Sequence, residues 1–299
     1  MEYIDAKTIV TNTGSLNRDY LAFEYVMNIY RGCSHGCIYC YARSNYYEKT
    51  DNFDCVRAKK DALRIIRDDI RKKKKRGVVF TAGMSDAYNP EEKEHKLTRN
   101  ALELINAFRF GACILTKSDL VLRDTDILSD IKEHSPASVN FTITCSDDEM
   151  SRKVEPFVSV TSERFKAIEH LTKKGIICGV LMDPIIPYIT DTKENVQEMV
   201  KKAKAHGAEY IYISTQVTMA DVQREYFYNE AEKHYPGISE KYKGKYKEYY
   251  YCRSPHGKKL WNTFVEACAK EGMRYDMQAA NRKIRQKYDN IMEQSVFDF

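Results

Sequence analysis

A repeated pattern of helix end, glycine and short apolar run constrains the fold of this chain more than any other feature. The pattern occurs four times, as KKKKRG before VVFTAG, NAFRFG before ACILTKS, HLTKKG before IICGVLMDP, and KAKAHG before AEYIYIST. Gly77, Gly111, Gly175 and Gly207 suit the left-handed backbone position that commonly follows a helix. Short apolar runs that alternate with helical segments predict βα units and a parallel sheet.

Two further segments extend this series of predicted strands. SVNFTITC (138–145) lies in the long interval between the second and third repeats, and another apolar run covers residues 23–29. With these two, the predicted strands before residue 216 number six. We therefore expect an α/β fold, a partial (β/α)6 TIM-like barrel over residues 20–216. In such barrels the chemistry lies at the C-terminal ends of the strands.

The alternation defines the expected domain organisation. Residues 1–19 precede the barrel as an N-terminal segment. From about Asp221 the alternation stops and the chain becomes rich in tyrosine and lysine, with helical stretches such as 260–269. We therefore expect residues 217–299 to form a helical C-terminal extension.

Composition and charge set broad limits on the function. A chain of 299 residues with 43% hydrophobic content can bury a substantial core. The net charge of +5 is modest, and the basic run RKKKKR (71–76) ends a helical pattern, where cations oppose the helix dipole. No apolar run reaches the roughly 20 residues of a membrane helix. The polar start MEYIDAKTIV lacks a signal-peptide pattern, so we expect a cytoplasmic protein without membrane contact.

Three of the nine cysteines lie in one short loop after the first predicted barrel strand. The segment 30–43 reads YRGCSHGCIYCYAR and carries Cys33, Cys37 and Cys40. Thiolates are the ligands of iron–sulfur clusters. Three ligands leave one iron of a cubane open to a cofactor, and Cys55 lacks the spacing of a fourth ligand. The loop therefore predicts a [4Fe-4S] cluster, with a zinc site or unmetallated core cysteines as the alternatives.

The pattern C-x3-C-x2-C, with an aromatic residue before the last cysteine, resembles the signature of the radical S-adenosylmethionine (radical SAM) superfamily. Further segments resemble the sequence blocks of its spore photoproduct lyase-like group, also labelled DNA repair photolyase-like, over roughly residues 20–215. These segments are TAGMSDAYNP (81–90), LTKSDLVLRD (115–124), VNFTITCSDDEMSRKVEP (139–156) and LMDPIIP (181–187).

The resemblance implies a radical SAM enzyme with two cofactors, a [4Fe-4S] cluster and S-adenosylmethionine. It implies that the reduced cluster cleaves S-adenosylmethionine to methionine and a 5′-deoxyadenosyl radical, which abstracts hydrogen from a substrate. A flavodoxin or ferredoxin is the implied electron donor, and DNA or another nucleic acid is the implied substrate class. The alternatives are a radical SAM enzyme acting on a peptide or small metabolite, and a non-catalytic iron–sulfur or zinc-binding protein.

The resemblance also implies four cofactor contacts. Tyr39 falls where the superfamily places an aromatic ring against the adenine, and such stacking is physically reasonable. Ser85, Lys117 and Thr142 match positions that contact S-adenosylmethionine in the lyase group. Lys117 is a cation suited to the cofactor carboxylate. Ser85 and Lys117 are expected at or near strand ends, and Thr142 in mid-strand.

Some features depart from the lyase pattern or stay open. Lyases carry a hydrogen-donor cysteine just before the Ser-Asp pair of the second strand, but this chain has AGM (82–84) before Ser-Asp (85–86). The resemblance therefore leaves dimer reversal in doubt and the net reaction open. Arg152 and Glu155 have two equal interpretations, cofactor contact or support of the barrel rim. Tyr41 matches a tyrosine near the lyase radical relay, but its type and position are too common to assign a role.

The C-terminal extension interleaves tyrosines with cations, as in YKGKYKEYYYCR (242–253). This composition can stack bases and neutralise phosphates. The helical spacing of Tyr235, Tyr242, Tyr246 and Tyr249 instead gives one coherent face, which favours packing against the barrel.

Two weaker patterns lie near the end of the chain. Cys252, His256 and Cys268 have the residue types of a second metal site, but their loose spacing favours ordinary buried residues. The tail QSVFDF (294–299) resembles short peptides that dock into bacterial sliding clamps, and a clamp is therefore a predicted partner. A folded-back or frayed end is the alternative.

Overall fold

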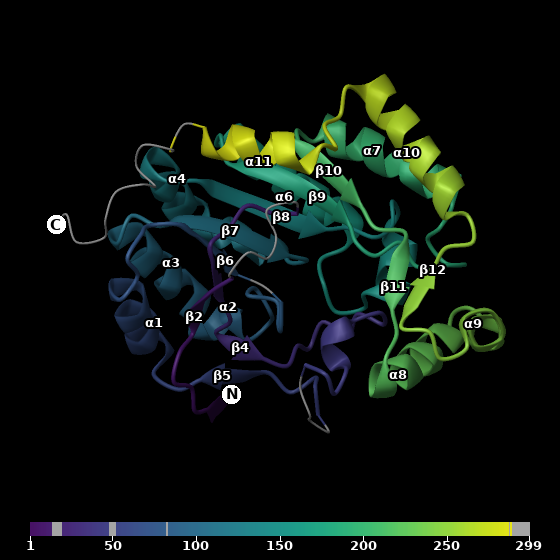
Figure 1. Cartoon of the computed structure of the whole chain (residues 1–299), viewed down its shortest axis with the longest axis horizontal. Coiled ribbons are helices and arrows are strands. Elements are labelled where there is room, and N and C mark those ends of the chain that lie inside the picture. The colour runs from purple at the N-terminus through teal and green to yellow at the C-terminus, as the bar shows by residue number, and fades with distance from the viewer. Residues whose placement is uncertain (14–19, 48–51, 82, 287, 289–299) are drawn as a thin grey trace.

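The computed structural model describes residues 1–13, 20–47, 52–81, 83–286 and 288, and its main feature is a seven-stranded sheet (Figure 1). The strand order is β10-β9-β8-β7-β6-β3-β2. The first six strands in this order are parallel neighbours, and β2 pairs antiparallel at the edge. These strands are β2 (Val10–Asn12), β3 (Tyr25–Met27), β6 (Val78–Thr81), β7 (Gly111–Thr116), β8 (Ala137–Thr142), β9 (Ile177–Met182) and β10 (Tyr210–Ile213). The six parallel strands, in chain order, confirm the expected partial (β/α)6 barrel.

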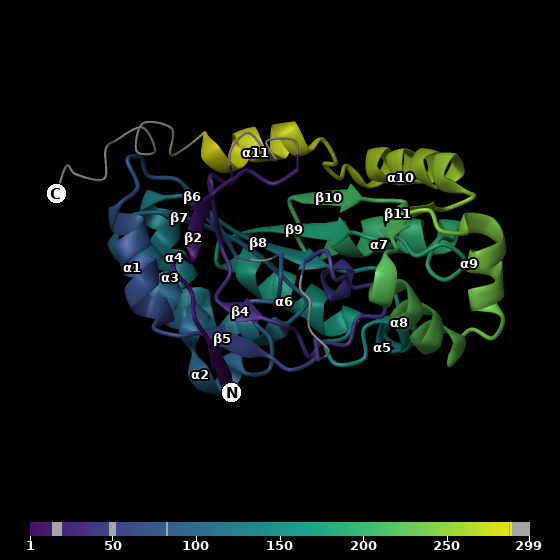
Figure 2. The ribbon, with the colours of Figure 1, turned by 60° about the horizontal axis from the view of Figure 1, so that its bottom comes forward.

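Helices cover one face of this sheet, as Figure 2 shows. Alternate strand residues such as Ile114, Phe141 and Val180 point to this outer face and form the largest core with the helices. The helices that connect the strands are α1 (Ala62–Arg71), α2 (Glu92–His95), α3 (Leu97–Ala107), α4 (Thr125–His134), α5 (Asp148–Val154), α6 (Thr161–Lys173) and α7 (Lys193–Ala205), with 3-10 turns η1 (Tyr41–Arg43) and η2 (Asp119–Asp124).

The inner face of the sheet packs against the end of the chain rather than against the βα helices. Helix α11 (Met277–Arg285) places Met277, Ala280 and Ile284 against inner-face residues that include Phe80 and Leu181. Burial of these apolar side chains is worth about 1.5–3 kcal/mol each. Helix α11 therefore seals part of the barrel interior.

Tyr210 fills a second part of the inner face. Its hydroxyl donates a hydrogen bond to Asn140 Oδ1, and its ring lies where a Cβ at position 179 would stand. Glycine at position 179 is therefore required by close approach, because any larger residue would overlap the Tyr210 ring.

Only two of the four repeat glycines adopt the left-handed conformation predicted for them. Gly175 and Gly207 have φ values of 74° and 83°. The prediction is wrong for Gly77 and Gly111, where close packing instead excludes a side chain. A Cβ at Gly111 would lie 2.6 Å from the carbonyl oxygen of Pro136, and the left-handed residue after that helix is Arg109.

The N-terminal segment is hydrogen-bonded to the barrel. β2 extends the main sheet, and β1 (Glu2–Ile4) joins β5 (Arg57–Lys59) and β4 (Tyr30–Arg31) in a small sheet of order β1-β5-β4. Asp69 Oδ2, on α1, accepts hydrogen bonds from the backbone N–H of Ile9 (2.7 Å) and Val10 (2.9 Å). These bonds hold the start of β2 against α1.

The C-terminal extension is mostly helical, as expected. Its elements are β11 (Gln216–Thr218), α8 (Asp221–Glu232), α9 (Ile238–Tyr246), β12 (Tyr251–Arg253), α10 (Gly257–Glu271) and α11. Tyr242 and Tyr246 are buried in a second core with Phe227, which agrees with the predicted tyrosine face. Tyr249 is 67% exposed, so it does not belong to that face. Helix α10 packs on α7, across the outer face of the barrel.

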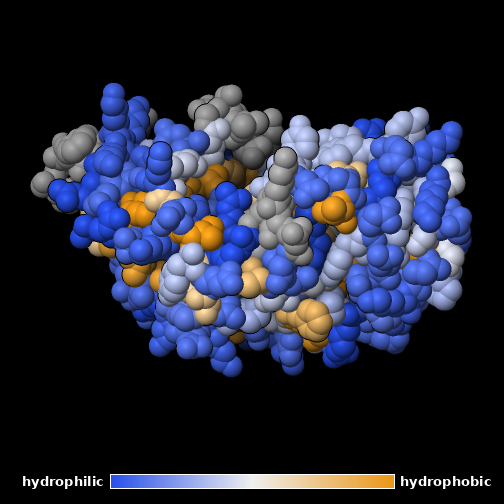
Figure 3. Space-filling view, turned by 90° about the horizontal axis from the view of Figure 1, so that it is seen from below, coloured by the Kyte–Doolittle hydropathy of each residue, from blue (hydrophilic) through white to orange (hydrophobic). Residues whose placement is uncertain are grey.

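In the described ranges, no helix is both long and apolar enough to cross a bilayer. The face seen in Figure 3 is mainly hydrophilic, with apolar residues in separate patches. The predicted clamp-docking tail, residues 294–299, lies outside the described residues.

Candidate functional site

Backbone hydrogen bonds from two sides fix the loop that carries the three cysteines. The N–H of Cys33 donates to the carbonyl of Phe53 (2.9 Å), and the N–H of Ile38 donates to the carbonyl of Val154 at the end of α5 (3.0 Å). Gly36 has a φ of 67°, and a Cβ there would lie 2.8 Å from the ring of Phe157. The loop therefore lies at the C-terminal edge of the barrel, after β4 and beside α5.

The three thiols lie near Lys117, the cation that directly follows β7. Burial raises the pKa of Cys33, Cys37 and Cys40, and the ammonium of Lys117 partly offsets that effect. Burial disfavours the charge of Lys117 in turn, but Cys37, Glu155 and other anionic groups outweigh it and raise its pKa. The predicted ligands and the predicted cofactor cation are therefore neighbours.

No anionic side chain among the described residues pairs with the charge of Lys117. Within the described part of the chain its Nζ makes no hydrogen bond or ion pair, and it lies 5.7 Å from the centroid of the Tyr39 ring. A mostly buried ammonium in this state fits an anionic group, because burying an unpaired charge is costly. The thiols and this cation together fit an iron–sulfur cluster and the carboxylate of S-adenosylmethionine.

A buried ion pair supports Tyr39. The Tyr39 hydroxyl donates to Glu155 Oε1, and Glu155 Oε2 pairs with Arg164 of α6 at 2.6 Å, with both charged side chains fully buried. Arg164 also donates to the carbonyl of Thr142 (2.8 Å). Glu155 therefore supports the site through Tyr39 and Arg164, which favours the rim-support interpretation. Arg152 is exposed on α5.

Asp86 links three segments of the site. Its Oδ1 accepts from Thr116 Oγ1 (2.7 Å), and its Oδ2 accepts from the backbone N–H of Lys117 (2.8 Å). The same Oδ2 lies 3.5 Å from Nδ1 of His35, and His35 stands between the first two loop cysteines in the sequence. Sequence reasoning assigned no role to Asp86, His35 or Arg164, although the Ser-Asp pair in the second block was a visible signal for Asp86.

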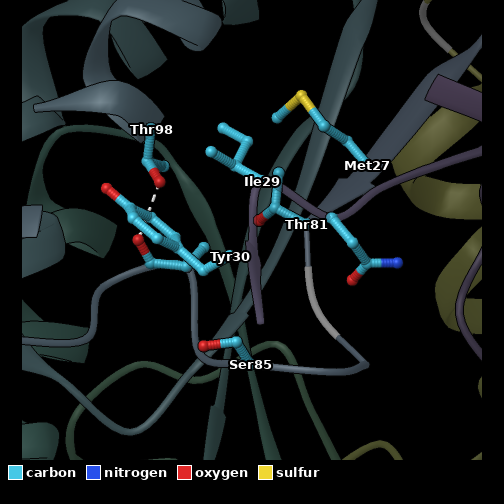
Figure 4. A pocket seen from close by; sticks show the side chains of 8 residues that line it. Met27, Ile29, Tyr30, Thr81, Ser85 and Thr98 are labelled. Atoms are coloured by element: carbon cyan, nitrogen blue, oxygen red, sulfur yellow. Dashed lines mark hydrogen bonds between the residues drawn. The ribbon is translucent and has the colours of Figure 1, made fainter. Parts of the chain in front are cut away.

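The two predicted hydroxyl contacts occupy different positions. Ser85 lies in the loop after β6 and lines a nearly filled pocket of about 10 Å³ beside Thr81 and Tyr30, shown in Figure 4. Thr142 is the last residue of β8, so its expected mid-strand position is wrong. The regular pairing with β9 ends at Thr142, which lies opposite Leu181. Both residues therefore lie at the C-terminal edge of the barrel.

The zinc interpretations receive no support from the geometry. Among the described residues, no three His, Cys, Asp or Glu side chains converge as ligands of a single metal ion. A cubane does not need such convergence, because its cysteines bind different irons. Cys252 and Cys268 are buried in separate cores, and His256 is the residue before α10, which agrees with ordinary packing roles.

The loop, the strand order and the sequence together define the class of this protein. A family model described as the radical SAM superfamily matches residues 27–203, more than half of the chain. The chain belongs to the radical SAM superfamily. It is therefore a radical SAM enzyme, and its cofactors are a [4Fe-4S] cluster and S-adenosylmethionine.

Similar sequences among curated proteins do not carry an assigned function. An uncharacterized protein of Methanocaldococcus jannaschii is 37% identical over 58% of this chain and 65% of its own length. An uncharacterized protein of Mycobacterium bovis is 29% identical over 64% of this chain and 58% of its own length. The chain thus spans less than two thirds of either relative.

Solved structures confirm the lyase-like resemblance at the level of the fold. Spore photoproduct lyase complexed with a dinucleoside spore photoproduct has a TM-score of 0.62 and 18% identity, over 90% of this chain and 79% of that one. A variant of the same lyase with bound AdoMet and the dinucleoside has a TM-score of 0.60 and 18% identity, over 87% and 78%. The partial barrel and most of the C-terminal extension thus belong to one shared fold.

Proposed function

We propose that Cys33, Cys37 and Cys40 hold the [4Fe-4S] cluster of this enzyme, and that its substrate is a nucleic acid. The observation that carries the ligand assignment is that three thiols of one loop, one buried and two partly buried, all lie near the ammonium of Lys117. When bound, the cofactors supply a 5′-deoxyadenosyl radical that abstracts hydrogen from the substrate. A flavodoxin or ferredoxin is the proposed electron donor.

The side chains around the loop have separate proposed roles. Lys117 binds the carboxylate of S-adenosylmethionine through a charge-assisted hydrogen bond. Tyr39, held by Glu155, provides the ring beside that cofactor. Ser85 and Thr142 supply hydroxyl groups at the same edge of the barrel. Asp86 keeps the backbone of Lys117 in place by accepting its N–H.

Exposed tyrosines next to the cysteine loop support a nucleic acid as substrate. Tyr41, one residue after Cys40, packs edge-on against Tyr47, with ring centroids 5.1 Å apart, and Tyr46 is 88% exposed. Tyr250 directly precedes β12. Burial raises its pKa, and a hydrogen bond to Tyr47 raises that pKa further, so the two tyrosines are neighbours. Exposed aromatic rings stack bases without regard to sequence. The related lyase fold has been solved with a dinucleoside photoproduct.

The reaction on that substrate differs from that of the lyases. The segment before Ser85 is AGM (82–84), so it lacks the cysteine that the lyase pattern places there. We therefore propose hydrogen abstraction from a nucleic acid without reversal of a thymine photoproduct.

Anaerobic reconstitution tests the ligand assignment. The wild-type protein should bind about four irons per chain and form 5′-deoxyadenosine from S-adenosylmethionine with dithionite. The Cys37→Ala variant should lose both, whereas Cys268→Ala, which removes a buried thiol on α10, should keep both. Full iron content and turnover in Cys37→Ala would contradict the assignment.

A further inference from the structure

A second pocket lies at the edge of the barrel, outside the site described above. Its volume is about 280 Å³, and it lies between the end of β10, helix α10 and the start of α11. The walls include Tyr212, Trp261, Phe264, Tyr275 and Asp276. Four of its eight lining residues are aromatic, and ligand pockets are commonly lined by apolar and aromatic side chains.

The aromatic rings hold one another in fixed orientations. Phe264 is buried, and its ring centroid lies 5.7 Å from both Trp261 and Tyr275. Trp261 and Tyr275 stand nearly perpendicular, at 88°, and are 46% and 38% exposed. Large ring surfaces therefore face solvent on a rigid support. Such surfaces stack planar ligands at little cost in side-chain entropy.

Charges of both signs lie at the pocket: Asp276 lines its wall, and lysines lie on the neighbouring surface of α10. Lys258 precedes Trp261 by one helical turn on α10, so the two side chains are neighbours on the helix surface. Lys258 and Lys259 are exposed, and within the described ranges neither makes an ion pair.

Polar atoms on one wall suit the edge of a nucleobase. Asp276 Oδ1 accepts the N–H of Ala279 at the start of α11 (3.0 Å), which fixes the carboxylate at the pocket wall. Its second oxygen can accept a hydrogen bond from an exocyclic amino group, as carboxylates do with bases. A nucleotide thus matches the pocket: its base can stack on the rings and bond to the Asp276 carboxylate, and its phosphate can bind Lys258.

Tyr212 connects this pocket to the mouth of the barrel. Its ring packs edge-on against Tyr20 at 4.9 Å. The Tyr20 hydroxyl in turn donates a hydrogen bond to Asp183 Oδ2 (3.4 Å). Asp183 directly follows β9, at the same C-terminal edge of the barrel as Lys117. The pocket is therefore linked, through Tyr212 and Tyr20, to a carboxylate at the edge of the barrel that carries the cofactor site.

We propose that this pocket binds one nucleobase of a single-stranded segment of the substrate, with Lys258 at its phosphate, next to the unit that reacts. This inference rests on the proposed nucleic-acid substrate and deepens it. It assigns the stacking surface to Trp261 and Tyr275.

A binding experiment on the reconstituted holoenzyme tests the pocket. The probe is a fluorescein-labelled single-stranded deoxyadenosine pentanucleotide, titrated anaerobically by anisotropy. Trp261 is the only tryptophan of the chain, so its fluorescence reports the site directly. We expect saturable binding with a change in tryptophan emission. Tyr275→Ala should weaken binding about tenfold, as for the loss of one stacked base.

Matched controls separate stacking from charge. Tyr3→Ala removes a tyrosine that is 58% exposed on β1, in the small sheet, and should bind the probe like the wild type. A pentamer with the same phosphates but without bases should bind weakly, and equally to wild type and Tyr275→Ala. Equal affinity of wild type and Tyr275→Ala for the deoxyadenosine probe, with both proteins folded by circular dichroism, would overturn the proposal.

The same preparations distinguish this proposal from the proposed catalytic function. Formation of 5′-deoxyadenosine without any oligonucleotide reports the cofactor site alone. If cleavage occurs but the probe leaves Trp261 emission unchanged, the pocket assignment is wrong and the cluster assignment stands. If the probe binds with the expected Tyr275 effect but no cleavage occurs, the pocket stands and the cluster assignment is wrong.

Discussion

The two sides of the barrel mouth use different chemistry. The cofactor wall, formed by Tyr39, Lys117, Glu155 and Arg164, has a fully buried ion pair between Glu155 and Arg164, and Glu155 also accepts a hydrogen bond from Tyr39. The aromatic wall, formed by Tyr212, Trp261, Phe264 and Tyr275, leaves ring surfaces partly open. The difference teaches that a resident cofactor site depends on side chains oriented in advance, whereas a site for an exchangeable ligand depends on accessible surface.

The largest expected effect comes from breaking the ion pair of the cofactor wall. Arg164→Ala leaves the carboxylate of Glu155 buried without its partner, so the free energy of unfolding should fall by about 3–5 kcal/mol. Urea denaturation followed by circular dichroism measures this change. The double variant Glu155→Leu/Arg164→Met should recover part of the loss, because it removes both charges. A loss below about 1 kcal/mol in Arg164→Ala would mean that the pair is not buried as described.

A smaller effect is expected for the cation of the same wall. Lys117→Ala should weaken binding of S-adenosylmethionine by about 1.5–3 kcal/mol, because a charge-assisted contact is lost. Iron content should stay at the wild-type level. Equilibrium binding to the reconstituted protein measures the affinity, and Lys153→Ala, a partly exposed lysine on α5 that pairs with Glu149, is the matched control. Unchanged affinity in Lys117→Ala would remove this residue from the cofactor site.

Variants of two helix caps, one beside each wall, allow a direct comparison of the walls. Asp147 caps α5 beside the cysteine loop, and Asp276 caps α11 beside the aromatic wall. Each carboxylate accepts a backbone N–H, so Asp147→Ala and Asp276→Ala should each lower the free energy of unfolding by about 1 kcal/mol. Only Asp147→Ala should also weaken S-adenosylmethionine binding, since the carbonyl of Val154 at the end of α5 holds the loop. Equal effects of both variants on cofactor affinity would contradict the separation of the two walls.

The smallest effect concerns the carboxyl group between the walls. Burial raises the pKa of Asp183, so the folded state disfavours its charged form. A raised carboxyl pKa costs stability at neutral pH, and this cost disappears below roughly pH 4, where the unfolded chain is also protonated. Asp183→Asn should therefore be slightly more stable than the wild type at pH 7, and the two stabilities should converge on acidification. Thermal denaturation between pH 4 and 8 tests this, and a pH-independent difference would contradict it.

The barrel was predictable from sequence because its signals are local and repeated. Each strand is a short apolar run after a helix, so six strands and the position of the cysteine loop followed from the order of residues. The prediction of a left-handed conformation at Gly111 was wrong, because the residue is needed there for its close contact with Pro136, which comes from another part of the chain.

The cofactor wall was only partly predictable. Lys117 was found through the block that carries it, whereas Arg164 gave no signal, because it lies on the next helix and its role depends on three-dimensional contact with Glu155. The aromatic wall gave no signal either. Tyr212 and Trp261 belong to separate elements, and only the packing of α10 and α11 at the barrel edge brings them together.

On the inner face of the barrel, the ring of Tyr210 fills the space that a side chain at position 179 would need. Descendants of this sequence should therefore change the two positions together, because a larger residue at 179 requires a smaller one at 210. Asn140 would then lose the hydroxyl that bonds its side chain, so it should drift toward an apolar residue in the same lineages. Mutational scanning in the wild-type background should find position 179 intolerant, and a background with a small residue at 210 should relax it.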